Sequence, residues 1–213
     1  MIGGCILAFL SAAVNAGFLI ELGTSVSHLT GDVSKVAVDA VRGNRQMSVD
    51  AIRLAIAALS FVGGAMAAGY FIHHPNLDLE RPYGRSVSCI GLCLMGAHFS
   101  LSGVPWLAVG LAGFSFGLQN ALATHYRGMV LRTTHLTGLL TDFGVHLGMR
   151  VRGHAIPSWK LIVPASLIVS FFSGAAFGSL LVLRWHLPFA LLLASAYLIG
   201  GIGWSAFKHL LLK

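Results

Sequence analysis

Two short motifs that combine histidine, threonine and glycine lie far apart in this chain. The first is Ser27-His28-Leu29-Thr30-Gly31-Asp32, and the second is Thr134-His135-Leu136-Thr137-Gly138-Leu139. Histidine titrates near neutral pH, so a pair of histidines could relay protons. A Thr-Gly step can cap or interrupt a helix and leave backbone N–H and C=O groups free to hold an ion or a small solute. A close helix–helix crossing through Thr and Gly explains the same step equally well.

The sequences on either side of the two motifs also correspond. An apolar segment with an amide side chain precedes each motif, with Asn15 before the first and Gln119 and Asn120 before the second. An apolar segment with small residues follows each motif, SFVGGA at 60–65 and SFFSGA at 170–175. The match predicts two internal repeats, about 1–103 and 104–213, inside a single membrane domain of residues 1–213.

The composition excludes a soluble globular protein. Of 213 residues, 56% are hydrophobic and only 10% are charged, whereas a soluble domain carries about 25% charged residues. The chain is therefore predicted to be an all-α polytopic membrane protein whose main partner is the lipid bilayer. The net charge of +7 does not indicate nucleic acid, because the basic residues lie in short loops where they orient a membrane protein.

Six apolar segments are long enough to cross a hydrocarbon core of roughly 30 Å. They are 2–21, 51–72, 86–103, 105–126, 160–183 and 187–207. Two further helical stretches, 26–41 and 133–148, are polar and short for a span. If these two re-enter without crossing, the chain has six spans and the repeats are inverted, which we favour. If they cross, it has eight spans and parallel repeats. Lys and Arg are biased to one face in both topologies, so they do not decide between the two.

Ionisable residues share one face of each short stretch. His28, Asp32, Lys35 and Asp39 are spaced four, three and four apart, and His135, Asp142 and His146 follow in the second copy. Each charge at membrane depth costs about 2.5–3.5 kcal/mol, so we expect Lys35 to pair with Asp32 or Asp39. Amphipathic helices lying on the membrane surface are the alternative. The predicted transport or substrate-binding residues are Asn15, His28, Thr30, Gly31, Asp32, Lys35, Gln119, Asn120, His135, Thr137, Gly138 and Asp142.

Other features of the sequence indicate packing. Cys5, Cys89 and Cys93 lie in apolar segments and are expected to pack as small residues. Gly64 with Ala68, Gly113 with Gly117, and Gly174 with Gly178 form small-xxx-small patterns, which predict close helix contacts within the chain, with a homodimer as the alternative. We expect no metal and no cofactor, and the polar segment 73–85 is expected to be a solvent loop.

The two motifs together resemble a known family. The first motif, the run Gly117–Ala121 and the segment RTTHLTGLLTDFG at 132–144 are similar to the two signatures of the YoaK family, also called the domain of unknown function 1275. The resemblance covers nearly the whole chain. It implies a six-span protein of the bacterial inner membrane, and it brings no substrate.

These observations favour a transporter or channel-like carrier of a small solute or ion, with the two motifs around a central site. An intramembrane enzyme that uses His and Asp for acid–base chemistry is the first alternative, although no clear nucleophile is evident. A non-catalytic membrane scaffold or sensor is the second.

Overall fold

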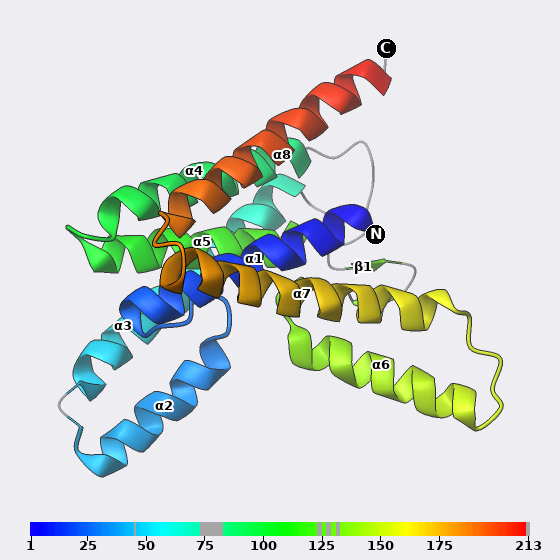
Figure 1. The fold of residues 1–213 in the computed structure, drawn as a ribbon, viewed down its shortest axis with the longest axis horizontal. Coiled ribbons are helices and arrows are strands. Elements are labelled where there is room, and N and C mark those ends of the chain that lie inside the picture. Colours follow the sequence, from blue (N-terminus) through cyan, green and yellow to red (C-terminus); the bar gives the residue numbers. More distant parts are fainter. Residues whose placement is uncertain (45, 73–82, 123–124, 127–128, 131–132, 212–213) are drawn as a thin grey trace.

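The computed structural model describes residues 1–213 except 45, 73–82, 123–124, 127–128, 131–132 and 212–213. The described part is helical apart from one pair of two-residue strands (Figure 1). Its elements are α1 (Ile2–Leu22), α2 (Leu29–Arg42), α3 (Met47–Ile72), α4 (Tyr83–Ser100), α5 (Pro105–Leu122), β1 (His125–Tyr126), β2 (Met129–Val130), α6 (Leu136–Val151), α7 (Trp159–Leu183) and α8 (Phe189–Leu211).

All eight predicted helical stretches coincide with observed helices, with ends that differ by a few residues. The predicted segment 105–126 ends too late. The helix stops at Leu122, and the antiparallel pair follows, with His125 opposite Val130. Polar residues lie at the end of the predicted segment and at the start of the sequence that follows it, and such residues favour a turn over a continued helix. The predicted solvent loop at 73–85 lies outside the described residues except for 83–85, which already belong to α4.

Four of the described helices are long and apolar enough to cross a membrane. They are α1, α7, residues Met47–Phe71 of α3 and residues Phe189–Leu210 of α8. The helices α4 and α5 have 18 residues each, which is long enough, but they are less apolar than these four. With 14 and 16 residues, α2 and α6 would be about 21 and 24 Å long, which is short for a bilayer core. The chain therefore folds as a helical membrane protein.

The six longer helices pack side by side, and α2 and α6 splay away from them on one side (Figure 1). The closest pairs are α3 with α5, α1 with α7, and α4 with α8. The helix α4 also contacts α5, and α1 contacts α8. Each short helix rests on the long helix that follows it, α2 on α3 and α6 on α7. The start of α1 and the end of α8 both lie toward the right in Figure 1.

Glycines allow the paired helices to approach each other closely. A Cβ atom on Gly64 of α3 would collide with the carbonyl oxygen of Phe114 in α5, and a Cβ on Gly174 of α7 would collide with that of Phe9 in α1. Gly117 is equally close to the Phe61 carbonyl. The prediction that small residues mediate packing within the chain is confirmed at these crossings.

Large apolar side chains are also abundant on the outside of the bundle. Met66 and Tyr70 of α3 are 69% and 74% exposed, and Ile199 of α8 is 72% exposed. Exposed apolar surface on this scale is unusual in a water-soluble monomer. It fits helices whose outer faces contact lipid.

Candidate functional site

The first motif is held in place by Asn15, which lies on α1. Its side-chain oxygen Oδ1 accepts hydrogen bonds from the hydroxyl of Ser25 (2.9 Å) and from the backbone N–H groups of Val26 and Ser27 (3.0 Å each). The Ser25 hydroxyl in turn accepts a bond from the His28 N–H (2.9 Å). One amide therefore fixes the path of the segment that leads into α2.

Asn120 on α5 holds the second motif through hydrogen bonds to Thr134. Its Nδ2 donates to the Thr134 hydroxyl at 2.6 Å, and that hydroxyl lies 2.8 Å from Asn120 Oδ1. The next-door residue Gln119 is buried and donates to the Thr133 hydroxyl (2.9 Å) and to the Leu7 carbonyl (3.1 Å). Its Oε1 accepts from the Tyr197 hydroxyl at 2.5 Å. All three predicted amides thus serve as structural ties next to the motifs.

His28 forms the N-cap of α2, and its ring is enclosed. It stacks on Phe171 of α7, with ring centroids 5.1 Å apart and an interplanar angle of 22°. Its Nδ1 lies 2.9 Å from the Ser27 hydroxyl, while its Nε2 is buried with no hydrogen-bond partner. Burial lowers the pKa of His28, the Ser27 backbone raises it, and the nearby His135 lowers it. The net effect is a lowered pKa of His28, and one of its ring nitrogens is buried without a hydrogen-bond partner.

His135 forms the N-cap of α6 but is exposed. Its ring lies over Gly138, where an added Cβ would be 2.6 Å from the ring Nδ1. In this motif the glycine therefore makes room for the histidine. Neither histidine cap is closed by a side-chain hydrogen bond, so the first N–H groups of both short helices have no side-chain acceptor.

The threonines and the first glycine occupy open positions. Thr30 and Thr137 lie within the first turns of α2 and α6, and both are exposed. The caps are thus the preceding histidines, and the suggestion that these threonines cap the helices is wrong. Gly31 is exposed, and apart from its chain neighbours and its own helix backbone no atom lies within 4 Å of the point where a Cβ would be.

Asp32 turns back to the start of its own motif. Its Oδ2 accepts the backbone N–H of Ser25 at 2.8 Å. Burial raises the pKa of Asp32, the Ser25 bond and Lys35 lower it, and Asp50 raises it. Asp32 therefore helps to fold the segment before α2 and lies within electrostatic range of charges on α3.

Lys35 binds across to α3 and not along its own helix, so the predicted pairing with Asp32 or Asp39 is wrong. Its Nζ lies 2.8 Å from Asp50 Oδ2. Asp39 instead accepts a bond from Asn44 at 3.1 Å. Helical spacing identified a charged face but could not show that a buried acid on the next helix lay opposite.

Lys35, Asp50 and Arg53 form a charged cluster at the start of α3. Asp50 and Arg53 were not predicted as site residues. They lie one turn apart at the start of α3, with Arg53 NH1 4.0 Å from Asp50 Oδ1. Arg53 also donates to the Leu22 carbonyl at 2.5 Å and lies 5.7 Å from the ring centroid of Trp106. The feature of the sequence that could have identified Asp50 and Arg53 is an acid and a base three residues apart in an otherwise apolar helix.

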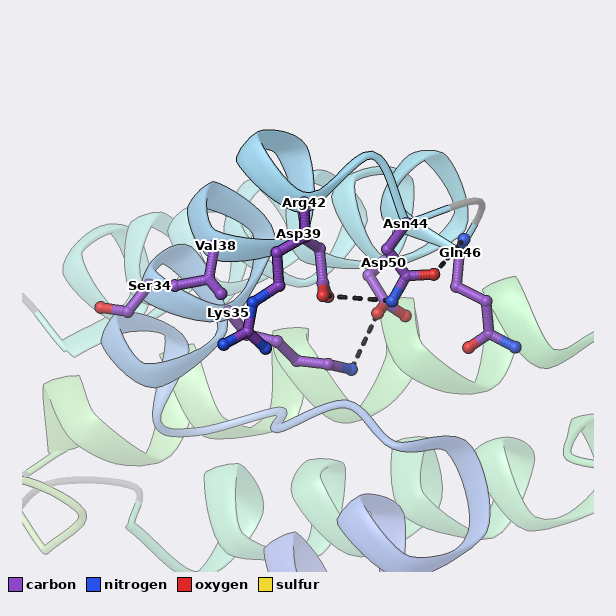
Figure 2. A pocket seen from close by; sticks show the side chains of 8 residues that line it. All are labelled: Ser34, Lys35, Val38, Asp39, Arg42, Asn44, Gln46 and Asp50. Atoms are coloured by element: carbon purple, nitrogen blue, oxygen red, sulfur yellow. Dashed lines mark hydrogen bonds and ion pairs between the residues drawn. The ribbon is translucent and has the colours of Figure 1, made fainter.

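An open cavity of about 370 Å³ separates α2 from α3 at this cluster. Figure 2 shows the Lys35–Asp50 ion pair spanning it, with the Asp39–Asn44 bond beside it. The cavity lining comprises Ser34, Lys35, Val38, Asp39, Arg42, Asn44, Gln46 and Asp50. It contains charges of both signs and is continuous with the outside.

The predicted site residues therefore separate into two groups. His135 lies close enough to His28 to lower the pKa of His28, and the three amides tie down the segments that present the two histidines. Lys35 and Asp32 belong instead with Asp50 on the α2–α3 side. Asp142 is half-buried on α6, where its carbonyl lies 2.6 Å from His146 Nδ1.

Helices that can cross a membrane and a chain that is apolar on its outside define the class as a helical membrane protein. Residues 3–204 match the family described as "Protein of unknown function (DUF1275)", so the chain belongs to that family. The resemblance to the YoaK family is thereby confirmed. No curated protein and no solved structure matches the chain.

Proposed function

We propose that this protein is a transporter or channel-like carrier of a small solute or ion in the bacterial inner membrane. It has six spans, two re-entrant short helices and two inverted repeats. The observation that carries the proposal is the placement of the two motifs. In each half, the chain leaves the first long helix and is held by an asparagine of that helix. It then starts a short helix at a histidine.

The helix contacts support the duplication. If α1, α2, α3 and α4 are exchanged for α5, α6, α7 and α8, the α1–α7 contact becomes α5–α3, and α2–α3 becomes α6–α7. The α1–α8 contact becomes α5–α4, while α4–α8 is unchanged. The Gly64–Phe114 and Gly174–Phe9 contacts also interchange. Such correspondence is expected of two repeats around a pseudo-two-fold axis.

The helix directions support inversion of the repeats. In Figure 1, α1 runs from right to left and α5 from left to right. The helices α3 and α7 are likewise opposed, as are α4 and α8. Each half then contributes three spans, because α2 and α6 are too short to cross. An odd number of spans turns the second half upside down.

The meeting of the two motifs supports a binding site between the halves. The starts of α2 and α6 lie near each other in the middle of the molecule, and the helices diverge from there (Figure 1). Helix N-termini carry partial positive charge and free N–H donors. Together with the unpartnered Nε2 of His28, they favour a solute with hydrogen-bond acceptors or negative charge. Transporters commonly bind substrates where broken helices meet near the membrane midplane.

A flux assay on the full chain in liposomes tests the proposal. The probes are chloride, inorganic phosphate and protons, with pyranine inside the vesicles to report protons. We expect flux of at least one probe above that of empty liposomes. His28→Ala and His135→Ala should abolish it while the protein stays folded, because they remove the two groups at the meeting point.

His154→Ala is the matched control, since this exposed histidine lies in the α6–α7 link outside both motifs. It should keep the wild-type flux. Equal flux in wild type and both motif variants would contradict the proposal. So would variants that lose flux only because they no longer fold.

A further inference from the structure

The two short helices are held against their long neighbours by different interactions. Positions are equivalent when counted from the motif histidine in α2 and α6, and from Gly64 and Gly174 in α3 and α7. Four such positions differ in charge between the two halves. They are Asp32, Lys35, Asp50 and Arg53 in the first half, and Leu139, Asp142, Lys160 and Val163 in the second.

In the first half these positions form a charged cluster. Lys35 reaches Asp50 at 2.8 Å across an open cavity of about 370 Å³, as Figure 2 shows. Asp50 is buried, whereas the Lys35 side chain is 46% exposed. Asp39 is the one buried residue of α2, and it is still 9% exposed. Little apolar contact therefore holds this helix in place.

In the second half two of the four positions, Leu139 and Val163, are apolar. Leu139 is 2% exposed and packs with Ala8, Val163 and Leu167 in one buried cluster. The charges at the remaining two positions are reversed, with Asp142 on the short helix and Lys160 on the long one. The structure records no ion pair between these two residues, and Lys160 lies 5.9 Å from the ring centroid of Trp159.

These two kinds of attachment differ in strength and in reversibility. A half-exposed ion pair gains little net free energy, because solvent screens it and the lysine loses rotamer freedom. Buried apolar packing gains free energy from every contact and resists separation. Elements held by few buried apolar contacts are the ones that open locally.

We propose that the Lys35–Asp50 ion pair is a latch that closes α2 onto α3, so that α2 is a movable gate while α6 stays docked. Arg53 keeps the acceptor in place, since it lies beside Asp50 and is anchored to the Leu22 carbonyl. Opening the latch widens the cavity between α2 and α3. This movement can be measured whether or not the protein carries a solute, so it stands apart from the transport proposal.

Distances between paired spin labels in lipid nanodiscs test the latch. The spin labels are attached at Val33 and Val62, which are exposed on α2 and α3. The background lacks the three free cysteines Cys5, Cys89 and Cys93. We expect one short separation in the wild type. Lys35→Met, which removes the charge but keeps the length, should add a population at longer separation. Lys35→Arg should keep the wild-type distribution.

The second half supplies the matched control. Labels at Leu140 and Phe172 occupy the equivalent exposed positions on α6 and α7, and Asp142→Asn removes the corresponding charge. That variant should leave the distribution unchanged, because Leu139 holds α6. The latch is overturned if Lys35→Met leaves the Val33–Val62 separation unchanged, or if both charge removals broaden both pairs equally.

Discussion

The two halves of the chain are built alike in their long helices and differently in their short ones. Gly64 and Gly174 meet equivalent carbonyl oxygens, of Phe114 and Phe9. The short helices instead diverge, with Asp32 and Lys35 in α2 where α6 has Leu139 and Asp142.

This contrast follows from what each contact tolerates. A glycine against a neighbouring backbone leaves no room for any side chain, so the crossing of two long helices permits no alternative there. A short helix that rests on the bundle can instead be held by charge or by apolar packing. The two halves therefore share their helix crossings and differ in how their short helices are held. The proposed latch lies in the first half, where an ion pair joins the short helix to its neighbour, whereas buried Leu139 holds the short helix of the second half.

The largest expected effect comes from filling the shared crossings. Gly64→Ala and Gly174→Ala should each destabilise the protein by about 3 kcal/mol or more, because the new methyl group collides with backbone that cannot rotate away. Equal losses would strengthen the equivalence of the halves. Thermal unfolding followed by tryptophan fluorescence in detergent measures them.

Gly63→Ala is the control for this series. Its Cβ would lie 3.9 Å from Phe114 Cδ2, an ordinary contact, so its unfolding temperature should stay near that of the wild type. A harmless Gly64→Ala, or losses that differ widely between Gly64 and Gly174, would break the comparison of the two halves.

A smaller and unequal effect is expected at the two asparagines. Asn15→Ala leaves the N–H groups of Val26 and Ser27 without their acceptor, at about 1–3 kcal/mol for each buried group. Asn120→Ala frees only the Thr134 hydroxyl, which can rotate toward another partner. Hydrogen exchange should therefore rise strongly in 23–28 of the first variant and weakly in 133–135 of the second. Similar changes in both segments would refute this ranking.

The smallest effect is a pH dependence that separates the two histidines. The pKa of folded His28 is below 6.5, so below that pH the unfolded chain takes up the proton first, and stability falls as the pH drops. Above pH 6.5 this histidine contributes no pH dependence. His28→Gln should flatten the decline in unfolding temperature from pH 6.5 down to pH 5, the range below the ordinary histidine pKa of about 6.5. His135→Gln should change the decline much less, because it removes only the smallest of the influences on the His28 pKa, and a decline that is the same in all three proteins would remove His28 as its source.

Much of the fold can be predicted from the sequence because long apolar stretches bounded by polar ones leave few alternatives. The helices α1 and α7 were expected at 2–21 and 160–183 and run over Ile2–Leu22 and Trp159–Leu183. Apolar content predicts a helix of this length wherever it must cross lipid. The end of α5 was placed too far along, since polar residues near a helix end do not show where it stops.

The contacts of individual polar residues were harder to predict. The importance of Asn15 and Asn120 follows from their matching positions, but which N–H groups they bind depends on how the chain turns back. Lys35 was assigned a partner within its own helix, whereas the ion pair forms with Asp50. Spacing along one helix gives local neighbours only. The burial of Asp50 and the position of Arg53 depend on how α2 rests on α3.

The central claim is that the halves are inverted around two short helices that do not cross the membrane. Thiol labelling from each side tests it, with single cysteines at Ser48 and His154 in the background without Cys5, Cys89 and Cys93. Both positions are exposed, one at the start of α3 and one in the α6–α7 link. We expect a membrane-impermeant maleimide to label the two from opposite faces. Labelling of both from the same face would mean that α2 and α6 span the membrane and the repeats are parallel, which would contradict the claim.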